Sequence, residues 1–204
     1  MFHGPKEKKE RALGVRLGLK GERALSPKSA LVRKPFRPGV HGPKSRPKAL
    51  SEFGLESHEK SKFKIMYGVN DSNLRRLFAM AELEKGASGA KLIEFLERRL
   101  DNVVFRLGFT VSRGAARQLI VQGHIAVNGK KVVSPGFMVK VKDKISISGE
   151  PTKTILAQKE SLAKYDAPSW LVLIPGKIEG EVISLPKDIE IPFEVNLLVE
   201  SFSK

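Results

Sequence analysis

The sequence of 204 residues contains no cysteine, so disulfide bonds and thiolate metal sites are excluded. Long apolar stretches are also missing, and none approaches the roughly 18 residues that a membrane-spanning helix needs. The residues that follow Met1 are Phe2, His3, Gly4 and Pro5, which lack the hydrophobic core of a signal peptide. We therefore expect a cytosolic protein that does not enter a membrane.

Acidic residues are few relative to basic ones, and the imbalance is concentrated at one end. The 37 Lys and Arg against 22 Asp and Glu give a net charge of +15. Residues 1–48 hold 14 of the basic residues and only 3 acidic ones, or +11, which leaves +4 for the remaining 156 residues. Such a surface attracts polyanions, and nucleic acid is the first candidate partner. Six prolines in this region break any continuous apolar helix face, which argues against membrane binding.

The hydrophobic content of 41% is sufficient to bury a core, and the pattern divides the chain into three parts. Residues 1–48 mix Gly, Pro and basic side chains, which predicts an extended arm with one short helical turn. Two interpretations remain open for it: an arm that orders on its partner, and a solvated tail in the free protein. Residues 49–90 predict a helical domain completed by residues 178–204. Residues 91–177 predict two helices packed on a small curled antiparallel sheet, so the fold class is α+β.

Four helices are expected from apolar spacing and end signals. The first two are capped by Ser57 and Asp71, and the second ends at Gly86 with an apolar face of Leu74, Leu77, Phe78 and Ala81. The third spans residues 90–107 and ends at Gly108. The fourth is capped by Ser112, turns Ala116, Leu119 and Ile120 inward, and ends at Gly123.

The strands are expected after the fourth helix. Asn128-Gly129 tolerates the positive φ angles of a tight hairpin turn between residues 124–127 and 130–133. Residues 139–147 alternate Val or Ile with polar residues around a bend at Asp143, as in a half-buried strand pair. Residues 170–174 and 181–185 predict two further strands, with a turn at Pro175-Gly176. Residues 196–202 are too few for periodicity to distinguish helix from strand.

The fourth helix and the hairpin carry the candidate site. Arg113 and Arg117 lie four apart and project from one helix face, and the free N–H groups after Ser112 can hold a phosphate. Short connections should keep the hairpin beside this helix, which would give one continuous basic groove. The remaining members of the candidate set are Gln118, His124, Asn128, Lys130 and Lys131. His124 could equally be a partly buried imidazole at the helix-to-strand junction.

Other features of the charge and composition bear on the kind of nucleic acid that this groove would bind. Arg75 and Arg76 lie off the apolar stripe of their helix and could reach phosphate, or could simply be solvated. Only 7% of residues are aromatic, and no predicted strand carries a Phe or Tyr stacking motif. We therefore expect recognition of the shape of folded RNA and not of an open single strand.

Several stretches resemble a known family. The sequence RRLDNVVFRLGF of residues 98–109, SRGAARQLI of residues 112–120 and GHIAVNG of residues 123–129 resemble the S4 RNA-binding domain. KPFRPGVHG of residues 34–42, KIMYG of residues 64–68, and the C-terminal stretches from Pro168 and from Ile191 resemble the bacterial small-subunit ribosomal protein S4 family. Further candidate RNA contacts are Arg37, His41, Lys44, Lys62, Lys64 and Tyr67.

The chain departs from the family at one place. Many members coordinate zinc near the N-terminus through four cysteines, and the matching positions here are Glu7, Glu10, Ala24 and Ser29. Two carboxylates and one hydroxyl are a poor replacement for four thiolates. We predict that no metal or other cofactor is bound and that the arm folds on RNA.

The resemblance implies a primary ribosomal-RNA-binding assembly protein of the small subunit. It further implies binding to a multi-helix junction in the 5′ domain of that RNA, contact with neighbouring ribosomal proteins, an influence on translational accuracy, and a capacity to repress its own messenger RNA. Two other classes of protein contain the same S4 RNA-binding domain and are alternatives to a ribosomal protein. They are RNA-modifying enzymes and free-standing RNA chaperones or ribosome rescue factors. The chain shows no phosphate-cradling glycine loop and no catalytic cluster, and its four His are scattered, so no enzyme and no small-molecule substrate are expected.

Overall fold

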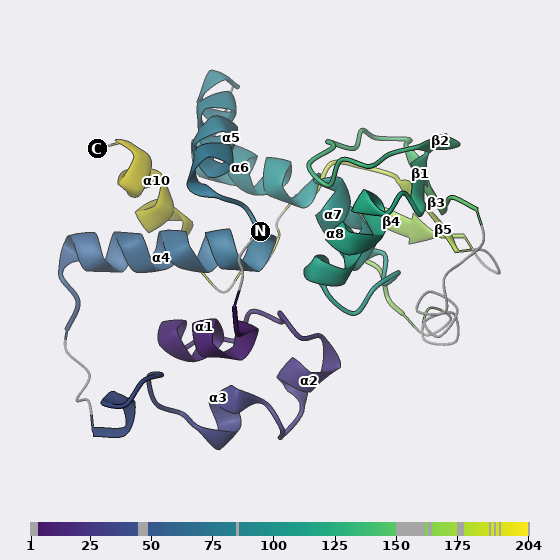
Figure 1. The fold of residues 1–204 in the computed structure, drawn as a ribbon. Coiled ribbons are helices and arrows are strands. Elements are labelled where there is room, and N and C mark those ends of the chain that lie inside the picture. The colour runs from purple at the N-terminus through teal and green to yellow at the C-terminus, as the bar shows by residue number, and fades with distance from the viewer. Residues whose placement is uncertain are drawn as a thin grey trace. The chain divides into compact units, whose positions relative to one another are not determined.

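The computed structural model describes residues 4–44, 49–84, 86–149, 162, 165–174, 178–187, 189, 191 and 193–203. The chain divides into two compact units, one formed by Met1–Lys91 with Ile191–Lys204 and the other by Leu92–Glu190. Helices and an antiparallel sheet occupy separate parts of the chain, which confirms the α+β class (Figure 1). None of the described helices is long and apolar enough to cross a membrane.

The arm contains more helix than one short turn, so that expectation was wrong. It forms α1 (Lys6–Leu13), α2 (Glu22–Leu25), α3 (Ala30–Arg33) and the 3₁₀ helix η1 (Gly42–Lys44). The buried carboxylate of Glu10 accepts hydrogen bonds from the backbone N–H groups of Leu17 and Leu19 at 3.1 and 3.2 Å. Gly42 lies so close to the chain that a Cβ there would come within 1.8 Å of the Arg37 carbonyl oxygen. Such contacts between polar groups and backbone leave no trace in apolar periodicity.

The helical part of the first unit begins with α4 (Glu52–Tyr67) and α5 (Asp71–Leu83). The caps are Ser51 and Asn70, whose side chains accept N–H groups three residues later, and not Ser57 and Asp71 as expected. The predicted apolar face of α5 is buried. The helix ends at Leu83, three residues before Gly86, because Glu84 is already in an extended conformation.

The segment whose type was left open is a helix, α10 (Val195–Ser203). Aromatic pairs attach this end of the chain to the first unit: Phe193 packs edge-on against Phe63 with ring centroids 5.0 Å apart, and Phe202 stacks on Phe78 at 4.9 Å. Of the residues 178–204 that were expected to complete the helical domain, Ile191–Lys204 group with the first unit. Residues 178–190 belong to the second unit and include a strand of its sheet.

The single helix expected over residues 90–107 is two helices, α6 (Ser88–Glu97) and α7 (Leu100–Arg106). Arg99 between them is extended, with φ −66° and ψ 136°, and forms a β-bridge with Met138. The N–H of Leu100 donates to the carbonyl of Phe137 at 2.8 Å. The break is caused by bonds to residues that are distant in sequence. No Gly or Pro therefore marks it in the sequence.

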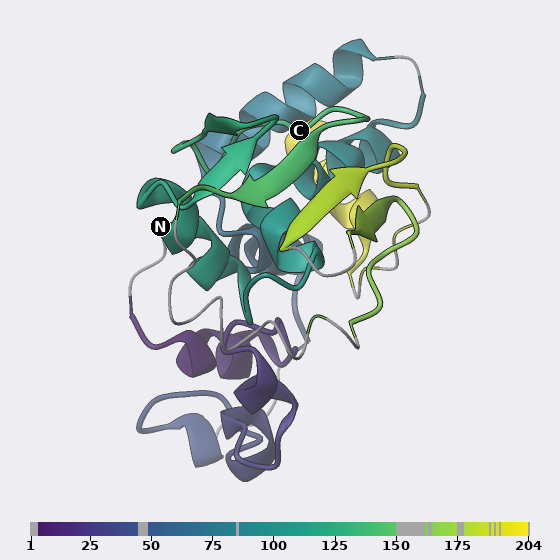
Figure 2. The same ribbon diagram turned by 90° about the vertical axis from the view of Figure 1, so that its right-hand side faces the viewer.

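The second unit contains a five-stranded antiparallel sheet that packs against α7 and α8 (Arg113–Val121) (Figure 2). Its strands are β1 (Ile125–Val127), β2 (Lys130–Lys131), β3 (Lys144–Ile147), β4 (Leu171–Leu173) and β5 (Glu179–Val182), in the order β2-β1-β3-β5-β4. The core joins helix residues such as Val103 and Ile120 to Ile125, Ile145 and Trp170. This packing places α8 beside the first hairpin.

The hairpin turn is as expected, since Asn128 and Gly129 have φ angles of 52° and 75°. The strand pair expected over residues 139–147 is wrong in its first half: only Lys144–Ile147 form a strand. Lys142 has a φ of 73°, which interrupts the extended backbone that a continuous strand would need. The strands expected at 170–174 and 181–185 exist as the shorter β4 and β5. The turn at Pro175-Gly176 and most of the polar stretch 150–164 lie outside the described residues.

Candidate nucleic-acid interface

Helix α8 begins where the sequence predicts. The Ser112 hydroxyl accepts a hydrogen bond from the Ala115 N–H at 3.3 Å, and Ser112 itself is buried. Ala116, Leu119 and Ile120 face the core. The amphipathic pattern therefore orients α8 with its basic side chains away from the sheet, while the N-terminal end of the helix dipole adds partial positive charge.

The two arginines of α8 are held by α7. The Nε of Arg113 donates to the amide oxygen of Asn102 at 2.6 Å, and its guanidinium lies over the ring of Phe105, 4.6 Å from the centroid. Arg117 reaches to 3.8 Å from a carboxylate oxygen of Asp101 and keeps 31% of its side chain exposed. Both side chains are thus half-buried and directed along the surface of the unit, which limits the rotamer entropy that a bound ligand would remove.

A buried polar network lies beneath these arginines. Glu97 is fully buried and accepts hydrogen bonds from both Nε and an Nη of Arg106 at 3.0 Å, and from the side-chain nitrogen of Asn102 at 2.6 Å. Asp101 accepts two hydrogen bonds from Arg99, at 3.1 and 2.7 Å. Buried carboxylates with such bidentate partners are satisfied and rigid. Asn102 connects the network to Arg113.

The hairpin adds two exposed lysines, Lys130 and Lys131. The side chain of Lys131 crosses Gly123, just after α8, so closely that a Cβ on Gly123 would come within 2.0 Å of its Cε. Gly123 has a φ of 80°, which also favours glycine. The end of α8 and strand β2 are therefore adjacent. We call the exposed face of α8, the hairpin and the loop 140–144 the helix–hairpin surface.

The three other predicted RNA contacts on α8 and the hairpin, Gln118, His124 and Asn128, differ from one another in their surroundings. Gln118 is exposed on α8, and His124 is half-buried at the helix-to-strand junction, where its backbone N–H donates to the Leu119 carbonyl at 3.0 Å. Asn128 uses its side chain internally: its nitrogen donates to Asp143 at 2.8 Å and its oxygen accepts the Lys144 N–H at 2.9 Å. Asn128 thus connects the hairpin to β3.

Sequence reasoning missed other residues of this surface. Lys140 and Lys142 are exposed on the loop before β3, where Asp143 accepts the Lys140 N–H at 2.7 Å, and Lys144 is exposed at the start of β3. Their alternation with Val and Ile was visible, but it was interpreted only as the solvent face of a strand.

Tyr165 was also missed, because it follows a polar stretch and lies on no strand. Its ring packs against Gly108, and 41% of the residue is exposed. Burial raises the pKa of its phenol, while the positive charges of Arg106 and Arg113 act in the opposite direction. Tyr165 therefore places an aromatic ring next to the basic face.

The candidates in the first unit are divided between surface and core. Arg75 and Arg76 are exposed on α5, and Arg37, His41 and Lys44 are exposed in the arm. Lys62 pairs with Glu59 and Lys64 with Asp71, and the hydrogen bond from Lys64 lowers the pKa of Asp71. Tyr67 is only 2% exposed, so it is a core residue and not an accessible RNA contact.

The positions that match the zinc cysteines of the family do not suit a metal. Glu7 pairs with Arg23 at 3.1 Å and Lys20 at 3.5 Å, and Glu10 is engaged by backbone N–H groups. Ala24 offers no donor atom, and Ser29 is buried. Among the described residues, no group of three or more His, Asp or Glu could hold a metal ion. Ion pairs and backbone hydrogen bonds organise this segment.

Two helices packed on a small antiparallel sheet, with basic side chains on the outer helix and the first hairpin, define an RNA-binding module. A family model described as the S4 domain matches residues 98–145. A second, described as the ribosomal protein S4/S9 N-terminal domain, matches residues 1–97. The two matches meet at the break between α6 and α7.

Full-length relatives agree with these matches. The chain is 44% identical to the small ribosomal subunit protein uS4 of Caldicellulosiruptor bescii, covering 100% of this chain and 99% of that protein. It is 41% identical to uS4 of Roseiflexus castenholzii and 42% identical to uS4 of a Thermoanaerobacter species, covering 100% of this chain and 98% of each relative. The chain belongs to the ribosomal protein S4 family. This family is structural, so the chain is not an enzyme.

Proposed function

We propose that this chain is a structural protein of the small ribosomal subunit that binds ribosomal RNA through its helix–hairpin surface. The observation that carries the proposal is the junction of α8 with β2, where Lys131 lies over Gly123 and brings the basic hairpin against the end of the helix that carries Arg113 and Arg117. As part of the ribosome, the protein works in the cytoplasm.

The chemistry of this surface suits the sugar-phosphate edge of folded RNA. Lys and Arg contact phosphates and release counterions, which provides affinity and register without reading bases. The network of Glu97 and Asn102 holds Arg113 in one orientation before binding. A preorganised basic face recognises the spacing of phosphates, which is a property of RNA shape.

A finer assignment follows from the family and is part of the proposal. The protein binds a multi-helix junction in the 5′ domain of the RNA as a primary assembly protein. It also contacts neighbouring ribosomal proteins, influences decoding accuracy and represses its own messenger RNA. The similarity along the full length to small-subunit proteins supports this assignment.

The helix–hairpin surface is tested with the double variant Arg117→Gln, Lys130→Gln. Removing each bond to a phosphate should lower the slope of log affinity against log salt by roughly 1, and affinity should fall for all RNA sequences alike. Filter binding to the 5′-domain transcript over a salt series measures both quantities. Lys187→Gln is the control, because Lys187 is exposed in the same unit but lies after β5. Equal affinity of the double variant and the control would remove this surface from the site.

A second experiment separates a ribosomal subunit protein from a transient factor. The chain should remain with small subunits that have been washed in high salt and sedimented. A factor that binds the ribosome only transiently would be released into the supernatant, and that result would contradict the structural role.

A further inference from the structure

Tyr165 provides a flat aromatic surface in the second unit. Its ring covers Gly108 so closely that a Cβ on Gly108 would lie 2.9, 3.0 and 3.1 Å from the Cδ1, Cγ and Cε1 atoms of the ring. Three adjacent ring atoms at nearly equal distances mean that the face of the ring, and not its edge, lies against Gly108. Because 41% of Tyr165 is nevertheless exposed, the exposed area lies mainly on the opposite face of the ring.

Two arginines lie close to this ring. Burial raises the pKa of the Tyr165 phenol, and the charges of Arg106 and Arg113 lower it. Arg113 extends from α8, and its guanidinium lies 4.6 Å from the centroid of the Phe105 ring. The N–H of Gly108 donates to the carbonyl of Phe105 at 2.9 Å, so the backbone connects the two aromatic residues. An open aromatic face therefore lies within electrostatic range of an arginine whose orientation is already fixed.

This combination matches the two parts of a nucleotide. A guanidinium binds phosphate oxygens, and the face of an aromatic ring stacks on a base whatever its identity. A base inside a double helix has both of its faces covered by its neighbours. The ring of Tyr165 can therefore receive only an unstacked base, which folded RNA presents in its loops, bulges and junctions.

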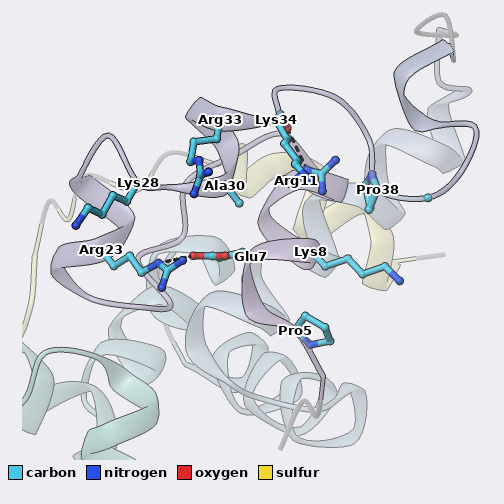
Figure 3. Close-up of a pocket in the computed structure, with 11 residues that line it drawn as sticks. Pro5, Glu7, Lys8, Arg11, Arg23, Lys28, Ala30, Arg33, Lys34 and Pro38 are labelled. Atoms are coloured by element: carbon cyan, nitrogen blue, oxygen red, sulfur yellow. Dashed lines mark hydrogen bonds and ion pairs between the residues drawn. The ribbon is translucent and has the colours of Figure 1, made fainter.

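The arm has charge and a ring but not this combination. The guanidinium of Arg11 lies over the ring of Phe36, 4.9 Å from its centroid, so a cation of the chain itself occupies that face. The arm also contains a cavity of about 430 Å³, where basic residues such as Arg23 and Arg33 gather (Figure 3). None of the described residues that line this cavity is aromatic. It therefore offers charge without a surface on which a base can stack.

We propose that Tyr165 is a specificity-determining residue of the RNA site, whose open face stacks on one unpaired nucleobase while Arg113 binds a phosphate of the same nucleotide or the next. The inference rests on the proposed function and deepens it, because the helix–hairpin surface by itself provides phosphate contacts only. It adds one base contact to the recognition of RNA shape. The RNA must then present an unpaired nucleotide beside the N-terminal end of α8.

The test compares Tyr165→Leu with Tyr165→Phe in the full chain. Stacking needs the ring and not the hydroxyl, so Tyr165→Leu should lower affinity for the 5′-domain transcript about tenfold, and Tyr165→Phe should leave it unchanged. Neither variant should change the slope of log affinity against log salt, because a stacked base releases no counterion. The variant Arg117→Gln, Lys130→Gln differs in this respect, since it should lower the slope.

Phe137→Leu is the control for the loss of an exposed ring. Phe137 belongs to the same unit and is 39% exposed, which is close to the value for Tyr165. Its carbonyl accepts the N–H of Leu100 at the start of α7, the opposite end of that helix from Gly108. We expect this variant to bind the transcript with unchanged affinity.

A tryptophan variant reports on the contact directly. Trp170 is the single tryptophan of the chain and is only 4% exposed, so the emission of the unsubstituted protein should change little when RNA binds. Tyr165→Trp keeps an aromatic ring over Gly108 and adds a second indole, whose emission a stacked base should quench. This measurement remains decisive even if urea unfolding shows that Tyr165→Leu does not fold.

Several outcomes would overturn the inference. They are unchanged affinity in Tyr165→Leu, an equal loss in Tyr165→Leu and Tyr165→Phe, a lowered salt slope in Tyr165→Leu, and emission of Tyr165→Trp that RNA does not quench. A loss seen on assembled subunits but not on the free transcript would also overturn it, because the ring would then contact a protein.

Failure of the proposed function is distinguishable from these results. If Arg117→Gln, Lys130→Gln still weakens binding, the proposed function stands without the base contact at Tyr165. If that double variant binds as its control does, and native and unrelated transcripts bind equally, the proposed function itself fails.

Discussion

Asn102 is a single residue on which both the core and the helix–hairpin surface depend. Its nitrogen donates to the buried Glu97 carboxylate and its oxygen accepts from Arg113. The apolar pattern of α7 does not indicate this role, because Asn102 interrupts it. The spacing of Arg113 and Arg117 predicted a basic face, but it did not show that one arginine is held by an amide and the other faces Asp101.

We expect Asn102→Ala to lower the free energy of unfolding by about 1–3 kcal/mol, because it leaves buried polar groups of Glu97 and Arg113 each with one partner fewer. RNA affinity should fall as well, since Arg113 is then no longer fixed in orientation. Urea unfolding and filter binding measure the two effects. Asn73→Ala on the exposed face of α5 is the control and should change stability by less than about 0.5 kcal/mol. Equal decreases in stability from both variants would show that the buried hydrogen bonds of Asn102 contribute no more to stability than an exposed side chain does.

The helices illustrate what end signals can and cannot predict. Ser112 was identified correctly because, unlike Thr110 two residues earlier, it directly precedes the first turn of the helix and its apolar stripe. In α4 two serines compete, and Ser57 was chosen although Ser51 is the cap. The helix extends six residues further toward the N-terminus because Ser51 satisfies the Gly54 N–H there.

This assignment can be tested with two alanine variants. Ser51→Ala should destabilise the first unit by about 1 kcal/mol, because the first turn of α4 is then uncapped. Ser57→Ala should be neutral or slightly stabilising, since alanine is the better helix former inside a helix. Thermal unfolding followed by circular dichroism compares them. A larger destabilisation by Ser57→Ala would place the start of α4 at the predicted position.

For the whole molecule, the distribution of charge is the property that indicates function most directly. Residues 1–48 carry +11 of the net +15, and the structure shows part of this charge gathered around one cavity. The second unit has its own core of helix and sheet residues, and no described residue of the arm belongs to this core.

Deleting residues 1–42 should therefore have a large effect on the salt slope of RNA binding and a smaller effect on the stability of the second unit. Every phosphate that the arm binds accounts for roughly 0.7–0.9 of the slope, and the deletion should release several phosphates together. Salt-dependent filter binding gives the slope, and unfolding monitored by the fluorescence of Trp170 reports on the second unit. An unaltered slope would mean that the arm binds no phosphate.

By itself, the sequence determined the α+β class, the apolar faces of α5 and α8, the Asn128-Gly129 turn and the basic character of the helix and hairpin. These features depend on local φ preferences and on side-chain periodicity, which neighbouring residues encode. The tertiary structure decided the break at Arg99, the folded arm, the internal role of Asn128 and the burial of Tyr67. Each of these depends on partners that lie far away in the chain or on bonds from a side chain to a backbone group, and neither kind of contact repeats with the period of a helix or a strand.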